Sequence, residues 1–146
     1  MRDKLAAEKD AYWAEQVDIQ RQVANAWRLN ALGKSKEALS ALSAAADAED
    51  RTEKSPATPG PLAPARELYG QMLLEQGQAS EALVQFKKTL AKEPNRLGAT
   101  VGAARAAKAA GKSEEAAVYY VKVLALTAEA DPVRREIAEA RAAAAK

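Results

Sequence analysis

The side chains that could do chemistry in this chain are carboxylates, lysines and arginines. The 146 residues include 22 Lys and Arg and 20 Asp and Glu, but no His or Cys. The chain therefore lacks the usual zinc sites, a Ser-His-Asp or Cys-His nucleophile pair, and a histidine general base. Its carboxylates and lysines are spread along predicted solvent faces, and no phosphate-binding glycine loop occurs. We therefore predict that the protein is not an enzyme and uses no metal or cofactor.

The charge balance and hydropathy limit the classes of partner. The formal net charge is +2, whereas phosphate binding needs a concentrated basic surface, so we predict no nucleic-acid partner. No apolar run approaches the length of about 18 residues that a membrane span requires, so we predict no membrane partner. The first residues lack the apolar core of a secretory signal. We expect a cytoplasmic protein if Met1 is native, whereas a fragment of a longer, exported protein would leave the compartment undefined.

Stretches without Gly or Pro predict helices along most of the chain. Residues 3–32 contain neither and carry apolar side chains on two faces, which predicts one long helix with two neighbours. Ser35 and Ser113 are expected as N-caps, and Asp131-Pro132 is a typical helix start. The last helix carries an apolar stripe formed by Val133, Ile137, Ala140 and Ala144. Shorter helices are expected over 35–48, 64–77, 79–92, 95–110, 113–128 and 131–146.

One segment interrupts the helical pattern. Four of the six prolines lie between residues 49 and 64, which excludes regular helix there. Within this segment, Ser55-Pro56 and Thr58-Pro59 are either modification or docking points, or parts of a connector fixed by its prolines.

The strongest pattern is a self-repeat with a period of 34 residues. Four landmarks of one copy return one period later, as the pairs Gly77–Gly111, Ala82–Ala116, Phe86–Tyr120 and Leu90–Leu124. A weaker third copy begins near Gly33 and is separated from the second by ten additional residues. A fixed period of this length predicts stacked helical hairpins, each unable to bury its apolar face alone.

This pattern resembles the tetratricopeptide repeat, which has a small residue at position eight, glycine at fifteen, a later A-x-x-x-F and a final proline. The resemblance implies an all-α fold, a right-handed α-solenoid of about three helix-turn-helix hairpins with a long N-terminal helix and a C-terminal capping helix. Only the middle repeat has the proline. The matching residues are Gly70, Gly77, Ala82, Phe86 and Pro94, then Ala104, Gly111, Ala116 and Tyr120, and upstream Ala26, Gly33, Ala38 and Leu42.

We expect a single domain over residues 1–146. Its parts are the N-terminal helix with the first repeat (1–48), the proline-rich insertion (49–63), the second repeat (64–94), the third repeat (95–128) and the capping helix (131–146). The run EDRTEKSPATPGP, followed by ARELYGQMLLEQG, also resembles the C-terminal part of longer bacterial tetratricopeptide proteins of undefined role.

In this family the first helix of each hairpin lines a concave groove that holds a peptide or partner helix. The resemblance therefore implies a non-enzymatic protein–protein interaction module. We hypothesise that Trp27 anchors an apolar group and that Arg105 and Lys108 pair with acidic groups of a peptide. The alternative is that Trp27 packs between helices while the two basic residues are simply solvated. By position, the implied partner-binding residues are Trp27, Asn30, Gln71, Leu74, Glu75, Val101, Arg105 and Lys108.

Tyr12 and Trp13 project from the predicted N-terminal helix beyond the repeats. If the chain is a fragment, they are expected to cover an upstream repeat. If it is complete, they indicate self-association, because exposed aromatic pairs are typical of interfaces. The alternative function is therefore a structural module that forms a homodimer through the N-terminal helix.

Overall fold

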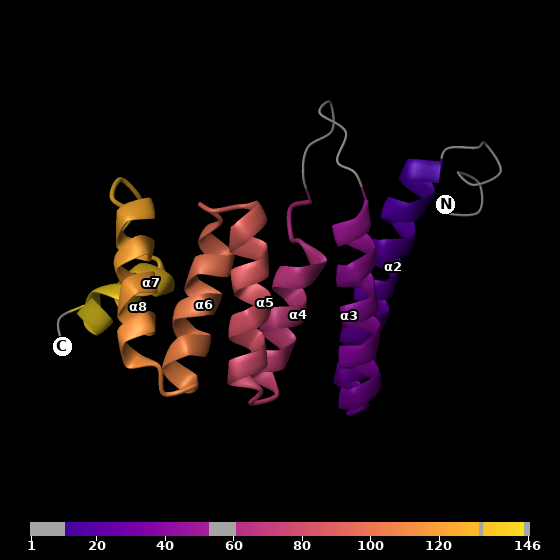
Figure 1. Cartoon of the computed structure of the whole chain (residues 1–146), viewed down its shortest axis with the longest axis horizontal. Helices are drawn as coiled ribbons and strands as arrows, with labels where there is room; N and C mark the ends of the chain where they lie inside the picture. Colours follow the sequence, from indigo (N-terminus) through magenta and orange to yellow (C-terminus); the bar gives the residue numbers. More distant parts are fainter. Residues whose placement is uncertain (1–10, 53–60, 132, 145–146) are drawn as a thin grey trace. The chain divides into compact units, whose positions relative to one another are not determined.

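The computed structural model describes residues 11–52, 61–131 and 133–144. Within these ranges the chain forms helices and turns but no strand, so the predicted all-α fold is confirmed (Figure 1). The Ser-Pro and Thr-Pro pairs of the insertion, and Pro132, lie outside the described residues. The helices are α2 (Ala11–Ala31), α3 (Ser35–Arg51), α4 (Ala65–Glu75), α5 (Ala79–Lys92), α6 (Leu97–Ala109), α7 (Ser113–Leu126) and α8 (Arg135–Ala144).

The chain forms two compact units. Unit 1 is Met1–Tyr69 and contains α2, α3 and the start of α4. Unit 2 is Gly70–Lys146 and contains the rest of α4 together with α5 to α8. The single domain expected over residues 1–146 stays a prediction.

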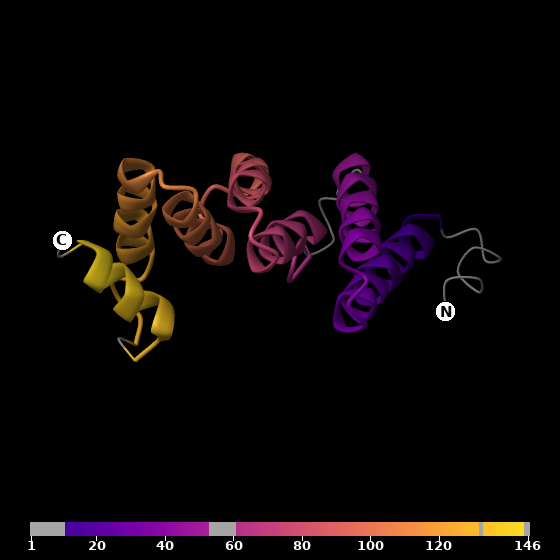
Figure 2. The ribbon, with the colours of Figure 1, turned by 90° about the horizontal axis from the view of Figure 1, so that it is seen from below.

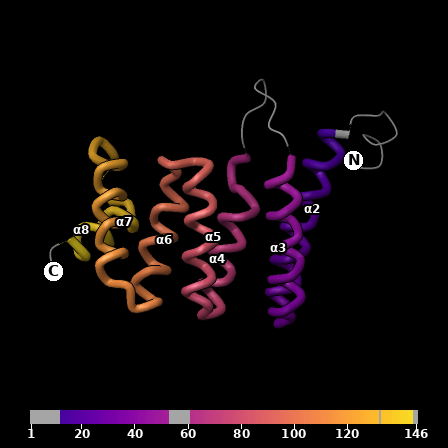
Figure 3. Tube along the Cα trace, in the orientation of Figure 1, coloured from indigo at the N-terminus to yellow at the C-terminus, as the bar shows by residue number. Residues whose placement is uncertain are grey.

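The three predicted glycine turns share one hydrogen-bonding pattern. Their glycines have φ values between 74 and 78°, a left-handed conformation that costs glycine little because it has no Cβ. At the first turn, the Gly33 N–H donates to the Asn30 carbonyl and the Lys34 N–H donates to the Leu29 carbonyl, each at 3.0 Å. The same pair of bonds, a Schellman motif, recurs at the other two turns. Figure 3 traces the backbone through the short turns between α4 and α5 and between α6 and α7. The sequence repeat therefore corresponds to one turn geometry used three times.

The predicted serine N-caps are wrong. α3 and α7 have Lys34 and Lys112 at the N-cap, without a side-chain cap hydrogen bond, and the serines are the first helical residues. The reason is the tightness of the Schellman turn. The residue after each glycine closes the preceding helix through its own N–H, so it is already the N-cap of the next helix.

The C-terminal helix begins later than predicted. Asp131 Oδ1 accepts a hydrogen bond from the Val133 N–H at 3.0 Å, and helix begins only at Arg135. In the predicted apolar stripe, the central residues Ile137 and Ala140 are buried. Val133 is 85% exposed, and the last residue of the stripe is also exposed. The stripe is therefore shorter than predicted because its first residue lies in the turn.

Unit 1 is built on the α2–α3 hairpin, whose two helices lie side by side (Figure 1). Most of the buried side chains in this hairpin are alanines, which allow helices to pack closely. The buried apolar residues are Ile19, Val23 and Ala26 of α2, and Ala38, Leu42, Ala45 and Ala46 of α3.

Unit 2 is a series of helices packed in sequence order. α6 contacts both α5 and α7, and α8 packs against α7 (Figure 2). The contact of α5 with α6 joins one predicted hairpin to the next. α8 packs against the third hairpin at the C-terminal end of the series, as expected for the predicted capping helix.

Phe86 packs between these hairpins. A Cβ atom on Gly102 of α6 would lie 2.3 Å from the Phe86 ring, and one on Gly70 of α4 would lie 3.1 Å away. The ring therefore packs directly on both backbones, and only glycine fits at position 102 without a shift of the ring. Tyr120 is buried one period later, so its ring repeats the packing role while its hydroxyl reaches a polar partner.

Candidate functional site

An ion pair joins α6 to α8 in unit 2. The Arg105 Nε donates to both carboxylate oxygens of Glu139, at 3.2 and 3.0 Å, and its Nη2 donates to Oε2 at 2.6 Å. The two residues are 34 positions apart, so Glu139 occupies on α8 the place that Arg105 occupies on α6. Their side chains are 37% and 27% exposed, which places the pair at the surface.

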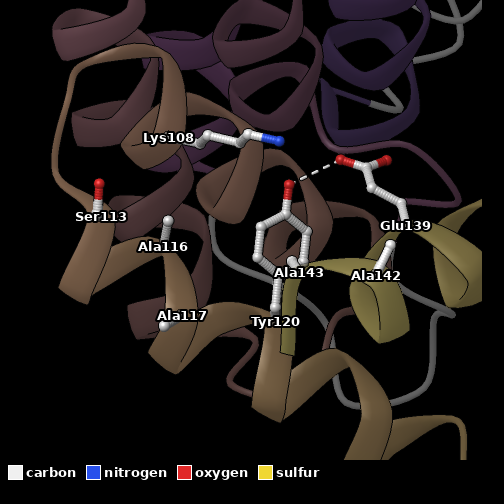
Figure 4. A pocket seen from close by; sticks show the side chains of 8 residues that line it. All are labelled: Lys108, Ser113, Ala116, Ala117, Tyr120, Glu139, Ala142 and Ala143. Atoms are coloured by element: carbon white, nitrogen blue, oxygen red, sulfur yellow. Dashed lines mark hydrogen bonds between the residues drawn. The ribbon is translucent and has the colours of Figure 1, made fainter. Parts of the chain in front are cut away.

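Tyr120 of α7 completes this cluster. Its hydroxyl donates to Glu139 Oε1 at 2.7 Å (Figure 4). Burial raises the pKa of Tyr120 to about 12, and the hydrogen bond to Glu139 adds to the rise. Hydrogen bonding from Arg105 lowers the pKa of Glu139 against the effect of partial burial, and the same bonds raise the pKa of Arg105. The carboxylate is therefore held ionised between a guanidinium and a neutral phenol.

A cavity of about 400 Å³ opens beside this pair (Figure 4). Its wall is mainly small apolar side chains from α7 and α8, and four polar groups border it, on Lys108, Ser113, Tyr120 and Glu139. A volume of this size with apolar walls and a few convergent polar groups is typical of a binding site. The lining residues are Lys108, Ser113, Ala116, Ala117, Tyr120, Glu139, Ala142 and Ala143.

Lys108 supplies the cation that borders the cavity. It follows Arg105 by one turn of α6, is exposed, and extends towards Tyr120 and Glu139 (Figure 4). Its charge contributes to the lowered pKa of Glu139, yet among the described residues Lys108 forms no ion pair of its own. Lys108 can therefore accept an external anion without breaking an ion pair within this part of the chain.

Arg105 differs from Lys108 in this respect. The sequence predicted that Arg105 binds an acidic partner, and the structure gives it an acidic partner within the chain, Glu139. An external carboxylate would have to compete with three hydrogen bonds. Binding of a partner by Arg105 stays a prediction, and Lys108 is the better placed of the two cations.

The other predicted partner-binding residues of unit 2 lie on α4 and α6. Gln71 and Glu75 are exposed, and the Gln71 Nε2 donates to Glu75 Oε1 at 3.0 Å. Leu74 is half-buried, and Val101 is 5% exposed. The three α4 residues thus present accessible surface, whereas Val101 presents little. Their binding role stays a prediction.

The predicted residues of unit 1 all lie on α2. Trp27 and Asn30 are half-buried. Near the start of α2, the Tyr12 and Trp13 rings meet edge to face, with centroids 5.1 Å apart and planes at 79°. Trp13 is 46% exposed and Tyr12 is half-buried. Partner binding by the first pair and oligomer contact by the second stay predictions.

A second polar cluster lies in unit 1, where α3 ends and α4 begins. Arg66 is only 6% exposed, and its Nε and Nη2 donate to Asp50 and Asp47 respectively, each at 2.5 Å. The Ala65 N–H donates to Glu49 Oε2 at 2.7 Å. Burial lowers the pKa of Arg66, but the bonds to the two aspartates outweigh it, so the pKa is raised. This cluster fastens the end of α3 to the start of α4.

Glu139 and the whole Arg66 cluster were not identified from the sequence. The repeat period could have identified Glu139, because Glu139 lies one period after Arg105 and so occupies the matching position on α8. Arg66 offered no comparable signal, because its partners lie across an insertion whose length follows no period.

The part of the chain that the structure describes contains no candidate metal site and no candidate membrane-spanning helix. No three Asp or Glu side chains there are grouped so that they could hold a metal ion. None of the described helices has both the length and the apolar character needed to cross a membrane.

Comparison with known proteins supports the fold through a solved structure rather than through sequence matches. No protein-family model and no curated protein sequence matches the chain. Among solved structures, the crystal structure of PcrH from Pseudomonas aeruginosa matches with a TM-score of 0.66 at 18% sequence identity. The match covers 88% of this chain and 89% of that one. The chain thus has a tetratricopeptide-like helical fold, whereas the narrower resemblance to longer bacterial proteins stays a prediction.

Proposed function

We propose that this chain is a non-enzymatic protein-interaction module. In this proposal, unit 2 binds a peptide or partner helix at the cavity that α6, α7 and α8 line. The observation that carries the proposal is the alanine-lined cavity bordered by Lys108. The tetratricopeptide-like fold supports it, because repeat proteins of this kind present extended surfaces for binding.

The electrostatics of the cavity favour binding over catalysis. A general acid or base works best with a pKa near the operating pH. The pKa of Glu139 is lowered by Arg105, and the pKa of Tyr120 is raised to about 12. Both groups therefore keep a fixed protonation state near neutral pH and serve to hold α6, α7 and α8 together.

Affinity capture with paired charge reversals tests the proposal. The wild-type chain, Lys108→Glu and Lys88→Glu would each be immobilised and exposed to a lysate of the source organism. Lys88 is also exposed but lies on α5 and does not line the cavity, so it controls for the change in net charge. We expect at least one protein to bind the wild type and Lys88→Glu but not Lys108→Glu. An identical set of bound proteins on all three baits contradicts the proposal.

A second candidate function is homodimerisation through α2. It is favoured by the aromatic pair near the start of that helix, in which Trp13 is 46% exposed. Light scattering over a concentration series would detect a dimer. The double substitution Tyr12→Ala plus Trp13→Ala is expected to abolish it, whereas Val121→Ala, at an exposed position of α7, is not. A monomer at every concentration, or a dimer that survives the double substitution, rules out this candidate.

A further inference from the structure

We infer that the cavity between α6, α7 and α8 binds a bulky apolar side chain of a partner peptide together with an acidic side chain beside it. This inference rests on the proposed function and specifies its ligand. Three features of the cavity carry it: the volume, the nature of the wall and the charge at the border.

The volume sets the size of the ligand. About 400 Å³ lies near the lower end of the range of roughly 300–1,000 Å³ that is usual for ligand sites. A site of this size holds one or two side chains rather than a whole helix. The cavity is therefore suited to an anchor residue of a partner that otherwise lies across the surface.

The wall sets the apolar part of the ligand. Ala116 and Ala117 of α7 face the same cavity as Ala142 and Ala143 of α8, and the Tyr120 ring lies between them (Figure 4). Methyl groups of alanine leave open the volume that a longer side chain would fill. A leucine or aromatic side chain from a partner would bury its own apolar surface there, and burial of such surface drives association.

The charge at the border sets the polar part of the ligand. Arg105 and Glu139 neutralise each other through three hydrogen bonds, and Tyr120 engages the same carboxylate. Together with Lys108, these side chains carry one net positive charge. The Ser113 hydroxyl is a further hydrogen-bond donor on the cavity wall. The complement of this border is a carboxylate, which distinguishes the site from a purely apolar one.

Small probes test this ligand chemistry directly on the full chain. The probes are 4-phenylbutyrate, which joins a ring to a carboxylate, and its neutral counterpart 4-phenylbutanamide. Titration followed by ¹H–¹⁵N NMR is expected to shift the amides of cavity residues such as Ser113, Ala117 and Ala142. Because an exposed ion pair contributes modestly, we expect the acid to bind about three- to fivefold more tightly than the amide.

Three substitutions in the cavity and one control outside it make the test specific. Lys108→Gln is expected to abolish the preference for the acid, so that acid and amide bind with similar affinity. Ala117→Leu and Ala142→Leu replace exposed alanines of the cavity wall with larger side chains and are expected to weaken both probes at least tenfold. Ala125→Leu makes the same change at an exposed position of α7 that does not line the cavity, and it is expected to leave both affinities unchanged.

Several outcomes would overturn the inference. Equal affinity for acid and amide in the wild type contradicts the carboxylate requirement. Absence of shifts at cavity amides at millimolar probe, or shifts that survive both leucine substitutions, contradicts the cavity as the site. If the probe results contradict the inference but Lys108→Glu loses a captured protein that Lys88→Glu retains, the inference alone fails and the proposed function stands.

Discussion

The two arginine clusters of this molecule use the same chemistry in different surroundings. Arg66 in unit 1 is 6% exposed and is held by two aspartates of α3. Arg105 in unit 2 is held by one glutamate of α8, and its side chain is 37% exposed. The first cluster fastens two helices across an insertion, whereas the second borders a cavity. The two clusters therefore differ in accessibility rather than in the kind of charges that they pair.

The largest expected effect comes from breaking the buried cluster. Arg66→Met would remove the charge-assisted hydrogen bonds that Arg66 donates to Asp47 and Asp50. We expect the free energy of unfolding to fall by about 2–3 kcal/mol, below the full cost of an unpaired buried charge because both aspartates retain some solvent contact. Urea unfolding of the purified variant measures this loss.

The exposed pair of Arg21 with Asp18 on α2 provides the control for that measurement. Arg21→Met removes the same charge from a side chain that is 61% exposed, so we expect a loss of less than about 0.5 kcal/mol. Equal losses for the two variants would show that burial does not distinguish the Arg66 cluster.

A smaller effect is expected from the exposed cluster. Glu139→Gln removes the negative charge but keeps the shape of the side chain, and Arg105 can then be solvated because it is partly exposed. We expect a loss of about 1 kcal/mol in the same urea assay. A loss as large as that of Arg66→Met would show that the Arg105 cluster is also mainly structural, which removes the contrast between the two units.

The smallest effect is a pH dependence of stability that arises from Glu139 and Tyr120 in unit 2. The pKa of Glu139 is lowered below the unfolded value of about 4.3, so its contribution to stability is present above that pH and is lost as the pH falls through the folded pKa. The pKa of Tyr120 is raised to about 12, so its contribution is present below the unfolded value of about 10 and is lost as the pH rises through 12.

Urea midpoints measured across the pH range check both directions. Glu139→Gln is expected to reduce the loss of unfolding free energy at acid pH by less than about 1 kcal/mol relative to the wild type. Tyr120→Phe is expected to reduce the corresponding loss at alkaline pH. If the variant Glu139→Gln loses as much unfolding free energy at acid pH as the wild type, protonation of Glu139 does not contribute to the pH dependence of stability.

The sequence predicted the fold well because its period constrains every hairpin in the same way. Glycines one period apart proved to form identical turns, and Phe86 proved to pack on two glycines. The prediction of serine N-caps was wrong because it relied on residue type alone. The tight turn places the N-cap at the preceding lysine instead.

The candidate site was only partly predictable. Lys108 was found from its position in the repeat, but the cavity beside it depends on alanines of α7 and α8 that look ordinary in the sequence. Arg66 was hidden for a different reason. Its aspartate partners are up to 19 residues away across the insertion, so neither helical spacing nor the repeat period connects them.

The central claim is that a partner docks at the cavity of unit 2, and site-specific photo-crosslinking tests it most directly. A photoreactive amino acid would replace Ala142 in the cavity wall or, as the matched control, Ala125 on α7; both positions are exposed. In extracts of the source organism, we predict a discrete crosslinked protein from position 142, weakened by Lys108→Glu, and none from position 125. Equal crosslinking from both positions, or crosslinking at 142 that Lys108→Glu leaves unchanged, would contradict the claim.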